Sequence, residues 1–272
     1  METRPIPSTG EMLPAIGCGT YLGFDVSIGS AAYKRLPDVL AALFDAGGTV
    51  LDSSSMYGRA EGVVGQLLKD SPHRPRAFLA TKVWTRGRAA GIAQMERSLD
   101  LMGADRIDLM QVHNLLDCRT HLDTLAGWKR DGRVRYVGVT HYTSSAFAEL
   151  AAVMETAELD FVQLNYSLDD RAAESHLLKL AQDRGIAILV NRPFGGGSLV
   201  RSLARETLPD FAREIGCESW SQLLLTFILT HPAVTCIIPG TGNPAHMADD
   251  VKAGIAIHPD ARERILKWWS SR

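Results

Sequence analysis

Four side chains in the first half of the chain could together donate a proton to a carbonyl oxygen: Asp52, Tyr57, Lys82 and His113. A free phenol has a pKa of about 10, so a tyrosine that donates a proton and regains it near neutral pH needs a value lower by about 2 units. Burial alone would raise the pKa of the Tyr57 phenol, so a nearby cation is required. Lys82 could supply that cation, because two unit charges about 4 Å apart interact by roughly 4 kcal/mol at an effective dielectric constant of about 20.

The other two residues complete this arrangement. A lysine in an enclosed site would lose its own proton unless an anion kept it charged, and Asp52 could do so. His113 could hydrogen-bond the carbonyl oxygen and orient it against the phenol. Such a group of side chains suits the reduction of a carbonyl, and the reagent that it needs is a hydride donor. Alone, Asp52 could cap a helix and Tyr57 could be a core phenol, so the hypothesis requires that all four come together.

Short apolar segments recur along the chain, and each is followed by a polar or glycine-rich turn and a segment with helical periodicity. Strands are expected at residues 16–19, 49–52, 77–82, 107–113, 134–140, 161–165, 186–191 and 235–239. Helices are expected in segments such as 38–46, 60–68, 91–101, 144–155, 174–184 and 219–229. Asn243 and Pro244 provide a capped start for another helix, and ARERILKWWSSR is expected to form a last one.

This alternation of strand and helix predicts a closed (β/α)8 TIM barrel, with a doubly wound open sheet as the alternative. Residues 1–272 are expected to form one domain, with a short N-terminal hairpin and an extra C-terminal helix. Active sites of such barrels lie at the carboxyl ends of the strands. A closed barrel would bring these polar or small residues to one mouth: Gly19, Thr20, Asp52, Lys82, His113, Thr140, His141, Gln163, Asn165, Asn191, Arg192, Gly240 and Thr241.

From about Pro5 to Ala253 the chain resembles the aldo-keto reductase family. VLDSSSMYGRAEGVVGQLL is similar to the family's pattern of an acid, a short spacer, Tyr-Gly, a Glu three residues later and Gly-x-x-Leu. LATKVW, IDLMQVHN, VRYVGVTHY, FVQLNYS and IIPGTGNPAHMADDVKA follow in the family's order for its Lys, its His, its cofactor residues and its phosphate-binding loop. The resemblance implies an NAD(P)H-dependent reductase of aldehydes or ketones, in which Asp52, Tyr57, Lys82 and His113 are catalytic.

The resemblance also implies a set of cofactor contacts. Gln163 would hold the nicotinamide amide, and Gly240, Thr241 and the start of the next helix would hold the adenosine-side phosphate, as free N–H groups at a helix start favour an anion. The remaining expected cofactor residues are Gly19, Thr20, Thr140, His141, Asn191, Arg192, Pro193, Gly195, His246 and Asp250.

Several of these positions depart from the family. Thr140-His141 stands where Ser-Asn is usual, Asn191 where a Tyr often stacks on the nicotinamide, and Gly240-Thr241 where Lys-Ser is frequent. His246 replaces a frequent Arg, and Asp250 replaces an Asn. Losing cations and gaining a carboxylate weakens the case for the 2'-phosphate of NADP, although Arg192 could compensate. NADPH is nevertheless the expected cofactor, because the resemblance to the family implies it, and NADH is the alternative.

The amino-acid composition limits which classes of binding partner and which cellular location are expected. With 29 Lys plus Arg and 31 Asp plus Glu, the net charge of -2 gives no reason to expect nucleic acid or an anionic membrane as partner. No apolar run approaches the roughly 20 residues of a membrane span, METRPIPSTG is no signal peptide, and the four cysteines form no C-x-x-C. A cytoplasmic monomer or small homo-oligomer acting on a small carbonyl compound is expected, with an export leader trimmed from the chain as an open alternative.

Three other functions remain as alternatives. Asp52, His113, His141 and another carboxylate could hold a metal in a hydrolase, although the first strand carries no H-x-H and no metal is expected. Lys82 could form a Schiff base, as in barrel aldolases. Alternatively, the altered nicotinamide contacts could belong to a nucleotide-sensing protein of the same fold with little turnover.

Overall fold

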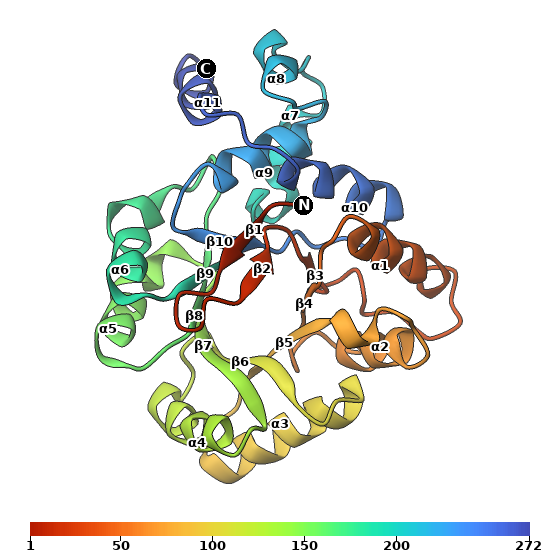
Figure 1. Ribbon diagram of the computed structural model, residues 1–272, viewed down its shortest axis with the longest axis vertical. Coiled ribbons are helices and arrows are strands. Elements are labelled where there is room, and N and C mark those ends of the chain that lie inside the picture. Colours follow the sequence, from red (N-terminus) through yellow and green to blue (C-terminus); the bar gives the residue numbers. More distant parts are fainter.

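The structure is a computed structural model that describes residues 1–272, and its centre is a barrel of parallel strands. Eight strands form one sheet in the order β10-β9-β8-β7-β6-β5-β4-β3. Isolated parallel bridges from Ile16 to Ile237 and from Gly19 to Gly240 join its two edges, so the sheet closes on itself. Figure 1 looks into this ring, with helices around it. The predicted (β/α)8 barrel is confirmed, and the open sheet is excluded.

The barrel strands lie close to their predicted positions. They are β3 (Cys18–Gly19), β4 (Val50–Asp52), β5 (Phe78–Val83), β6 (Ile107–His113), β7 (Val134–Thr140), β8 (Phe161–Asn165), β9 (Ala187–Asn191) and β10 (Val234–Ile237). The first strand is shorter than predicted, because Ile16 pairs with Ile237 of β10 while only Cys18 and Gly19 pair with β4.

The outer layer consists mainly of α1 (Leu36–Asp45), α2 (Ala60–Leu68), α3 (Arg88–Met102), α4 (Cys118–Arg130), α5 (Phe147–Thr156), α6 (Leu177–Arg184), α9 (Trp220–Leu229) and α10 (Pro244–Asp250). Short 3-10 helices are η1 (Tyr33–Arg35), η2 (Arg74–Arg76), η3 (Ser144–Ala146), η4 (Ala172–Ser175), η5 (Gly195–Gly197) and η6 (Val251–Gly254). As predicted, Asn243 caps α10, because its side chain accepts a hydrogen bond from the Ala245 amide.

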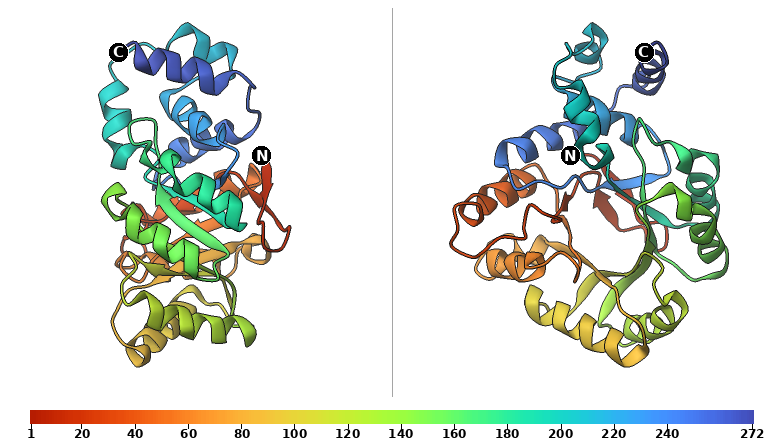
Figure 2. Two further views of the ribbon diagram at one scale, coloured as in Figure 1. Left: turned by 90° about the vertical axis from the view of Figure 1, so that its left-hand side faces the viewer. Right: turned by 180° about the vertical axis from the view of Figure 1, so that it is seen from behind.

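Three further helices lie together at one side of the barrel, beyond its ring: α7 (Ser198–Leu203), α8 (Asp210–Glu214) and α11 (Ala261–Ser270) (Figures 1 and 2). The final helix α11 was predicted, whereas α7 and α8 were not. Helix α4 was not predicted either, because two of its four buried side chains, His121 and Thr124, are polar and interrupt its apolar stripe.

The barrel interior is apolar at the strand starts and polar at the strand ends. Side chains alternate along a strand, so every second residue points inward. The interior floor is one buried cluster that includes Phe78, Leu109, Tyr136 and Phe161. Two positions further along the same strands come Ala80, Gln111, Gly138 and Gln163, and two positions beyond those come Lys82, His113, Thr140 and Asn165. The inward-facing residues of each strand, which recur every two positions, are thus apolar at the floor of the barrel and polar at its mouth.

An N-terminal hairpin closes the floor from below. Strands β1 (Thr3–Pro5) and β2 (Met12–Pro14) pair in antiparallel register, and both lie across the barrel in Figure 1. Ile6 and Leu13 of this hairpin are fully buried or nearly so and belong to the same cluster as the floor residues. The hairpin was predicted, and it seals the end of the barrel that lies opposite the mouth.

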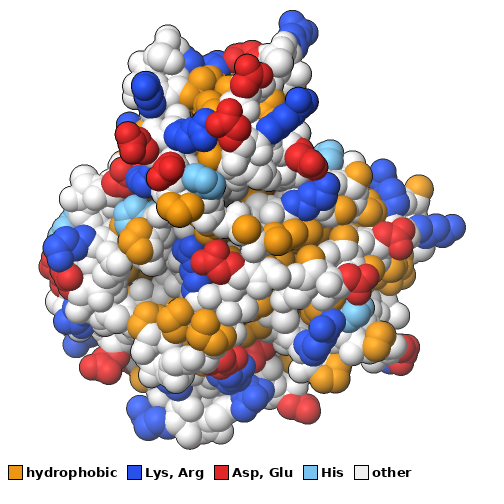
Figure 3. All heavy atoms as spheres, turned by 45° about the horizontal axis from the view of Figure 1, so that its top comes forward, with side chains coloured by type: hydrophobic (Ala, Val, Ile, Leu, Met, Phe, Trp, Pro, Cys, Tyr) orange, Lys and Arg blue, Asp and Glu red, His pale blue; other side chains and the backbone are white.

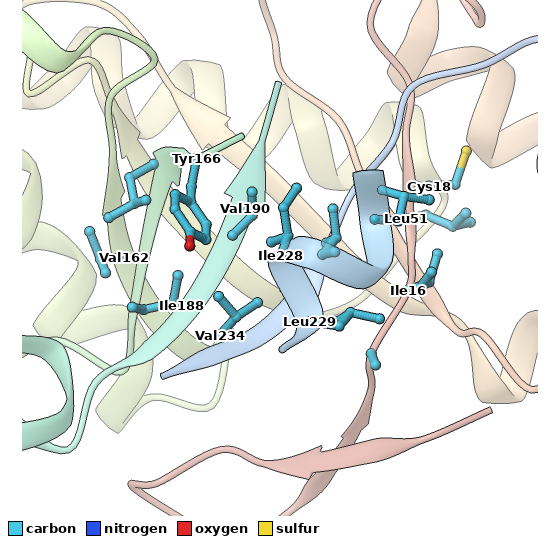
Figure 4. Close-up of a cluster of buried hydrophobic side chains, with 14 of the residues drawn as sticks. Ile16, Cys18, Leu51, Val162, Tyr166, Ile188, Val190, Ile228, Leu229 and Val234 are labelled. Carbon is cyan, nitrogen blue, oxygen red and sulfur yellow. The ribbon is translucent and has the colours of Figure 1, made fainter. Parts of the chain in front are cut away.

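The outward-facing side chains form the larger core, between the strands and the helices. In Figure 4, Val162, Ile188 and Val190 of β8 and β9 belong to one buried cluster with Ile228 and Leu229 of α9. Each fully buried aliphatic side chain of this kind contributes about 1.5–3 kcal/mol relative to an exposed one. This layer fixes the strands on which the site residues stand.

Acidic and basic side chains are mixed over the face drawn in Figure 3. No helix combines the length and the apolar composition that a bilayer crossing requires.

Candidate active site

A buried ion pair lies at the ends of β4 and β5. The Lys82 ammonium donates to Asp52 Oδ2 at 2.6 Å and to the carbonyl oxygen of Ser53 at 2.6 Å. Both side chains are almost completely buried, with 0% and 3% of their surface exposed. Burial alone would lower the pKa of Lys82, but the negative charge of Asp52 and its hydrogen bond raise that pKa above its ordinary value. The lysine is therefore held as a cation, as predicted.

Two buried amides hold the other oxygen of the Asp52 carboxylate. Asp52 Oδ1 accepts a hydrogen bond from Gln163 Nε2 at 2.9 Å and from Gln111 Nε2 at 3.3 Å. Gly138 leaves space for this arrangement, because a Cβ at that position would lie 3.3 Å from Gln111 Cγ and 2.7 Å from the Phe161 carbonyl oxygen. Thr140 fixes Gln163 in turn by donating to its Oε1 at 3.1 Å.

Tyr57 lies in the turn between β4 and α2, against the ion pair. Lys82 Nζ lies 5.2 Å from the centre of the phenol ring, and the His113 ring lies 6.1 Å from it in an edge-on orientation. Glycine suits the next position, because Gly58 has a φ of +58° and a Cβ there would lie 2.5 Å from the Asp25 carboxylate. The Tyr-Gly pair seen in the sequence thus fits the backbone of this turn.

One expectation about Tyr57 was wrong. A depressed pKa was expected from the sequence, but burial raises the pKa of the Tyr57 phenol more than the Lys82 ammonium lowers it. Asp52, in contact with that ammonium, opposes its effect and raises the pKa further. The phenol of Tyr57 therefore keeps its proton throughout the neutral range.

His113 ends β6 and is held by the same turn that carries Tyr57. Its Nδ1 lies 3.1 Å from Ser54 Oγ, and Ser54 Oγ also accepts a hydrogen bond from the Met56 amide at 3.2 Å. Burial, the Lys82 charge and His141 lower the pKa of His113 to about 3. The imidazole is consequently neutral at physiological pH.

These groups open onto a cavity of about 680 Å³ at the barrel mouth. The predicted site residues that line it are Gly19, Asp52, Tyr57, His113, Thr140, Gln163, Asn191, Arg192, Pro193, Gly240 and Thr241. Six predicted residues do not line it: Thr20, Lys82, His141, Gly195, His246 and Asp250. Another cavity, of about 760 Å³, lies at the strand starts between the hairpin and α11, and it contains none of the predicted site residues.

For four of these six residues the structure shows what holds them outside the cavity wall. Lys82 lies fully buried behind the wall, paired with Asp52, and Thr20 donates to the Asp52 carbonyl oxygen and to Ser53 Oγ. His141 stacks on Tyr142. Tyr142 lines the cavity at the point where His141 was expected. Asp250, the last residue of α10, is buried, and burial and the neighbouring Asp249 raise its pKa to about 8.

The burial of Asp250 changes one argument about the cofactor. In the sequence, its carboxylate counts against a bound 2'-phosphate. With a pKa of about 8, however, the group is mostly protonated at neutral pH, and it does not line the cavity. Arg192 does line the cavity, and its guanidinium lies over the Tyr142 ring at 5.7 Å without an acidic partner. The lining of the cavity therefore fits an anionic ligand better than the sequence suggested.

The cavity wall also contains residues that the sequence analysis did not assign to the site. Those with large side chains are Tyr21, Leu22, Met56, Trp84, Asn114, Tyr142, Phe194 and Ile238. Tyr21, Leu22, Met56 and Tyr142 are strongly exposed, at 58%, 70%, 44% and 46%, and form an apolar rim. Their position directly after strand ends, or within the turn that carries Tyr57, is the sequence signal that could have identified them.

The first and last loops of the barrel form one side of the mouth. A Cβ at Gly23 would lie 2.8 Å from the Gly242 nitrogen, and a Cβ at Gly242 would lie 2.9 Å from the Gly23 carbonyl oxygen. The two backbones thus touch directly, which only glycine allows at these positions. This contact continues the Gly19 to Gly240 bridge that closes the barrel.

Two of the alternative functions lack the geometry they need. No group of three or more His, Cys, Asp or Glu side chains is placed to hold a metal ion, so a metal-dependent hydrolase has no ligand set here. A Schiff-base lysine must be available as the neutral amine, whereas Lys82 is ion-paired and its pKa is raised.

Comparison with known proteins agrees with this site. The sequence model described as the aldo/keto reductase family matches residues 15–267. Aldo-keto reductase YhdN of Bacillus subtilis is 29% identical over 75% of this chain, and the match spans 63% of that protein's length, just under two thirds. An NADH-specific methylglyoxal reductase of Escherichia coli is 27% identical, with 78% of this chain and 73% of that protein matched.

A solved structure extends the comparison to the fold. The crystal structure of an aldo/keto reductase from Klebsiella pneumoniae, in complex with NADP and acetate, matches with a TM-score of 0.81 and 25% identity. The match covers 96% of this chain and 92% of that one. With a family match over nearly its whole length, the chain belongs to the aldo/keto reductase family of oxidoreductases.

Proposed function

We propose that this protein reduces an aldehyde or ketone to the alcohol with NADPH, or with NADH, and that Tyr57 is the proton donor. The observation that carries the proposal is that Tyr57 and His113 line one cavity, 6.1 Å apart between ring centres, with the buried Lys82–Asp52 pair against Tyr57. A bound nicotinamide would supply the hydride to the carbonyl carbon. The oxygen of the carbonyl then needs one proton, and Tyr57 is the protonated group beside it.

The residues have separate tasks in this reaction. His113, which is neutral, hydrogen-bonds the carbonyl oxygen and orients it. Tyr57 donates its phenolic proton as negative charge develops on that oxygen, and the phenolate that remains is stabilised by the adjacent Lys82 cation. A proton from solvent restores the phenol. Asp52 keeps Lys82 charged and takes no proton itself.

The cavity residues fit a nicotinamide dinucleotide. Gln163 lies at the cavity wall with its amide fixed by Thr140 and Asp52, which suits it to hold a planar amide in one orientation. Gly240 and Thr241 expose backbone at the far side, and Arg192 provides a cation for a phosphate. The NADH-specific relative supports NADH as the alternative, while the NADP complex of the Klebsiella protein supports NADPH. Nothing in the site favours a nucleotide sensor over a reductase.

The direct test is a titration of the protein with NADPH and NADH, followed by turnover. Binding is measured by the change in protein and cofactor fluorescence, and oxidation of the cofactor is followed at about 340 nm with 4-nitrobenzaldehyde, whose ring suits the apolar rim. We expect micromolar binding of at least one cofactor and steady oxidation that depends on the aldehyde. Failure to bind either cofactor would refute the proposal, and binding without turnover would favour the sensor.

The pH profile of kcat/KM should show no inflection caused by titration of His113. Because its pKa is lowered to about 3, the imidazole stays neutral between about pH 5 and pH 8, whereas an unperturbed histidine would titrate near 6.5. We expect kcat/KM to show no inflection near pH 6.5 when measured with saturating cofactor. An inflection there that disappears in His113→Asn would contradict this.

The lowered pKa of His113 also makes the free energy of unfolding smaller at acidic pH. Below about pH 6.5 the unfolded chain binds a proton at His113 that the folded chain does not bind until about pH 3. The free energy of unfolding therefore decreases as the pH drops through this window. Urea titrations at several pH values would measure the effect, with His113→Asn as the control that lacks it.

A further inference from the structure

We infer that Ser54 is a positioning residue, which fixes His113 as the tautomer that carries its proton on Nε2, the nitrogen available to the carbonyl oxygen. The inference rests on the proposed function and deepens it. It concerns the middle serine of Ser53-Ser54-Ser55, the only one of the three whose hydroxyl contacts the imidazole.

The hydrogen bonds of Ser54 determine which group is the donor. Its Oγ accepts from the Met56 amide at 3.2 Å, and its only other side-chain contact is His113 Nδ1 at 3.1 Å. The Ser54 side chain is buried, with 1% of the residue exposed, and these two groups are the only hydrogen-bond partners of its hydroxyl. If Nδ1 carried a proton and donated it, the hydroxyl would accept twice and its own proton would be left without an acceptor, which is costly in a buried site.

The hydroxyl of Ser54 therefore donates, and Nδ1 accepts. A neutral imidazole has one N–H, and with Nδ1 occupied as an acceptor the proton must be on Nε2. The two ring nitrogens point away from one another, so Nε2 is turned away from the Ser54 turn. His113 lines the cavity, between the rings of Tyr57 at 6.1 Å and Trp84 at 6.4 Å.

The tautomer matters because a carbonyl oxygen can only accept hydrogen bonds. An Nε2–H group attracts it and orients it, whereas a lone pair on Nε2 would repel it. Ser54 contacts neither substrate nor cofactor in this scheme, since it does not line the cavity. It acts through His113 alone.

The first experiment reads the tautomer without reference to activity. In protein labelled with 15N-histidine, long-range 1H–15N correlation spectra distinguish protonated from unprotonated ring nitrogens, and the His113 signals are identified by their loss in His113→Asn. We expect the folded protein to show a protonated Nε2 and a hydrogen-bonded, unprotonated Nδ1. A protonated Nδ1 in the unmodified protein would overturn the inference, and this result does not depend on any variant folding.

The second experiment removes the hydroxyl. In Ser54→Ala, the Nδ1 resonance should move toward that of an acceptor without a partner, and kcat should fall about tenfold, while the Kd for NADPH stays within about twofold. Ser54→Thr, which keeps a hydroxyl, should retain the original spectrum and most of the rate. Unchanged 15N signals in Ser54→Ala would overturn the role of Ser54.

Ser55→Ala is the matched control, because the Ser55 hydroxyl lies in the same turn but donates to the Lys82 carbonyl oxygen at 3.2 Å. It should leave the His113 spectrum unchanged. If the tautomer is as inferred but the unmodified protein reduces no carbonyl compound, the proposed function fails while the assignment of Ser54 as the partner of Nδ1 stands.

Discussion

Replacing Tyr57 with phenylalanine is expected to reduce kcat for aldehyde reduction by about a hundredfold to ten-thousandfold, while the Kd for the cofactor changes by less than about threefold. The loss follows from the role of a positioned general acid, which contributes a factor of this size. The phenylalanine ring keeps the packing against Tyr21, whose ring centre lies 4.9 Å from that of Tyr57, so the shape of the cavity is preserved. The substitution therefore removes only the phenolic hydroxyl with its dissociable proton.

The measurement is cofactor oxidation under saturating substrate, beside a fluorescence titration of the cofactor. Tyr136→Phe is the matched control, because it removes a phenolic hydroxyl from the floor of the barrel, where that group contacts Thr9 and Glu11 instead of the cavity. The control should keep its rate. If Tyr57→Phe retained most of the original rate, another group would have to be the proton donor.

Breaking the Lys82–Asp52 ion pair is expected to have the largest effect on stability. Lys82→Met leaves the Asp52 carboxylate buried without its cation, and removing one partner of a buried pair typically costs about 3–5 kcal/mol. Two amides, from Gln111 and Gln163, still donate to Asp52 and moderate the loss. Turnover should also be lost, because the phenolate of Tyr57 would have no cation beside it.

The double variant separates these two effects. Asp52→Asn combined with Lys82→Met removes both charges, so neither is left buried alone, and the free energy of unfolding should recover most of what the single change loses. Turnover should remain as low as in Lys82→Met. Urea unfolding of the single and double variants measures the stability, and cofactor oxidation measures the rate. A Lys82→Met protein as stable as the original would show that the pair contributes little.

The sequence predicted well those features that follow from strand periodicity. Asp52, Lys82 and His113 end neighbouring strands, and inward-facing side chains at strand ends must converge if the barrel closes. The strand at residues 107–113 coincides with β6, because its apolar run is bounded by a clear turn on each side. Family motifs added Tyr57, which no periodicity could place because it stands in a turn.

Other features could not be predicted because they depend on distances between segments far apart in the chain. The raised pKa of Tyr57 depends first on how deeply the folded chain buries the phenol, and then on where Lys82 and Asp52 lie relative to it. The burial of Asp250 depends on which face of α10 lies against its neighbours, and a helix of seven residues gives little periodicity to decide that. Tyr142 occupies the cavity wall in place of His141 through a local turn that two adjacent aromatic residues do not reveal.

The hairpin β1–β2 leaves the barrel with a single entrance. Ile6 and Leu13 plug the end opposite the mouth, so every molecule that reaches Tyr57 has to pass the same rim of apolar side chains. Access to the phenol is therefore controlled from one end of the barrel, by the loops that follow the strands and not by those that precede them.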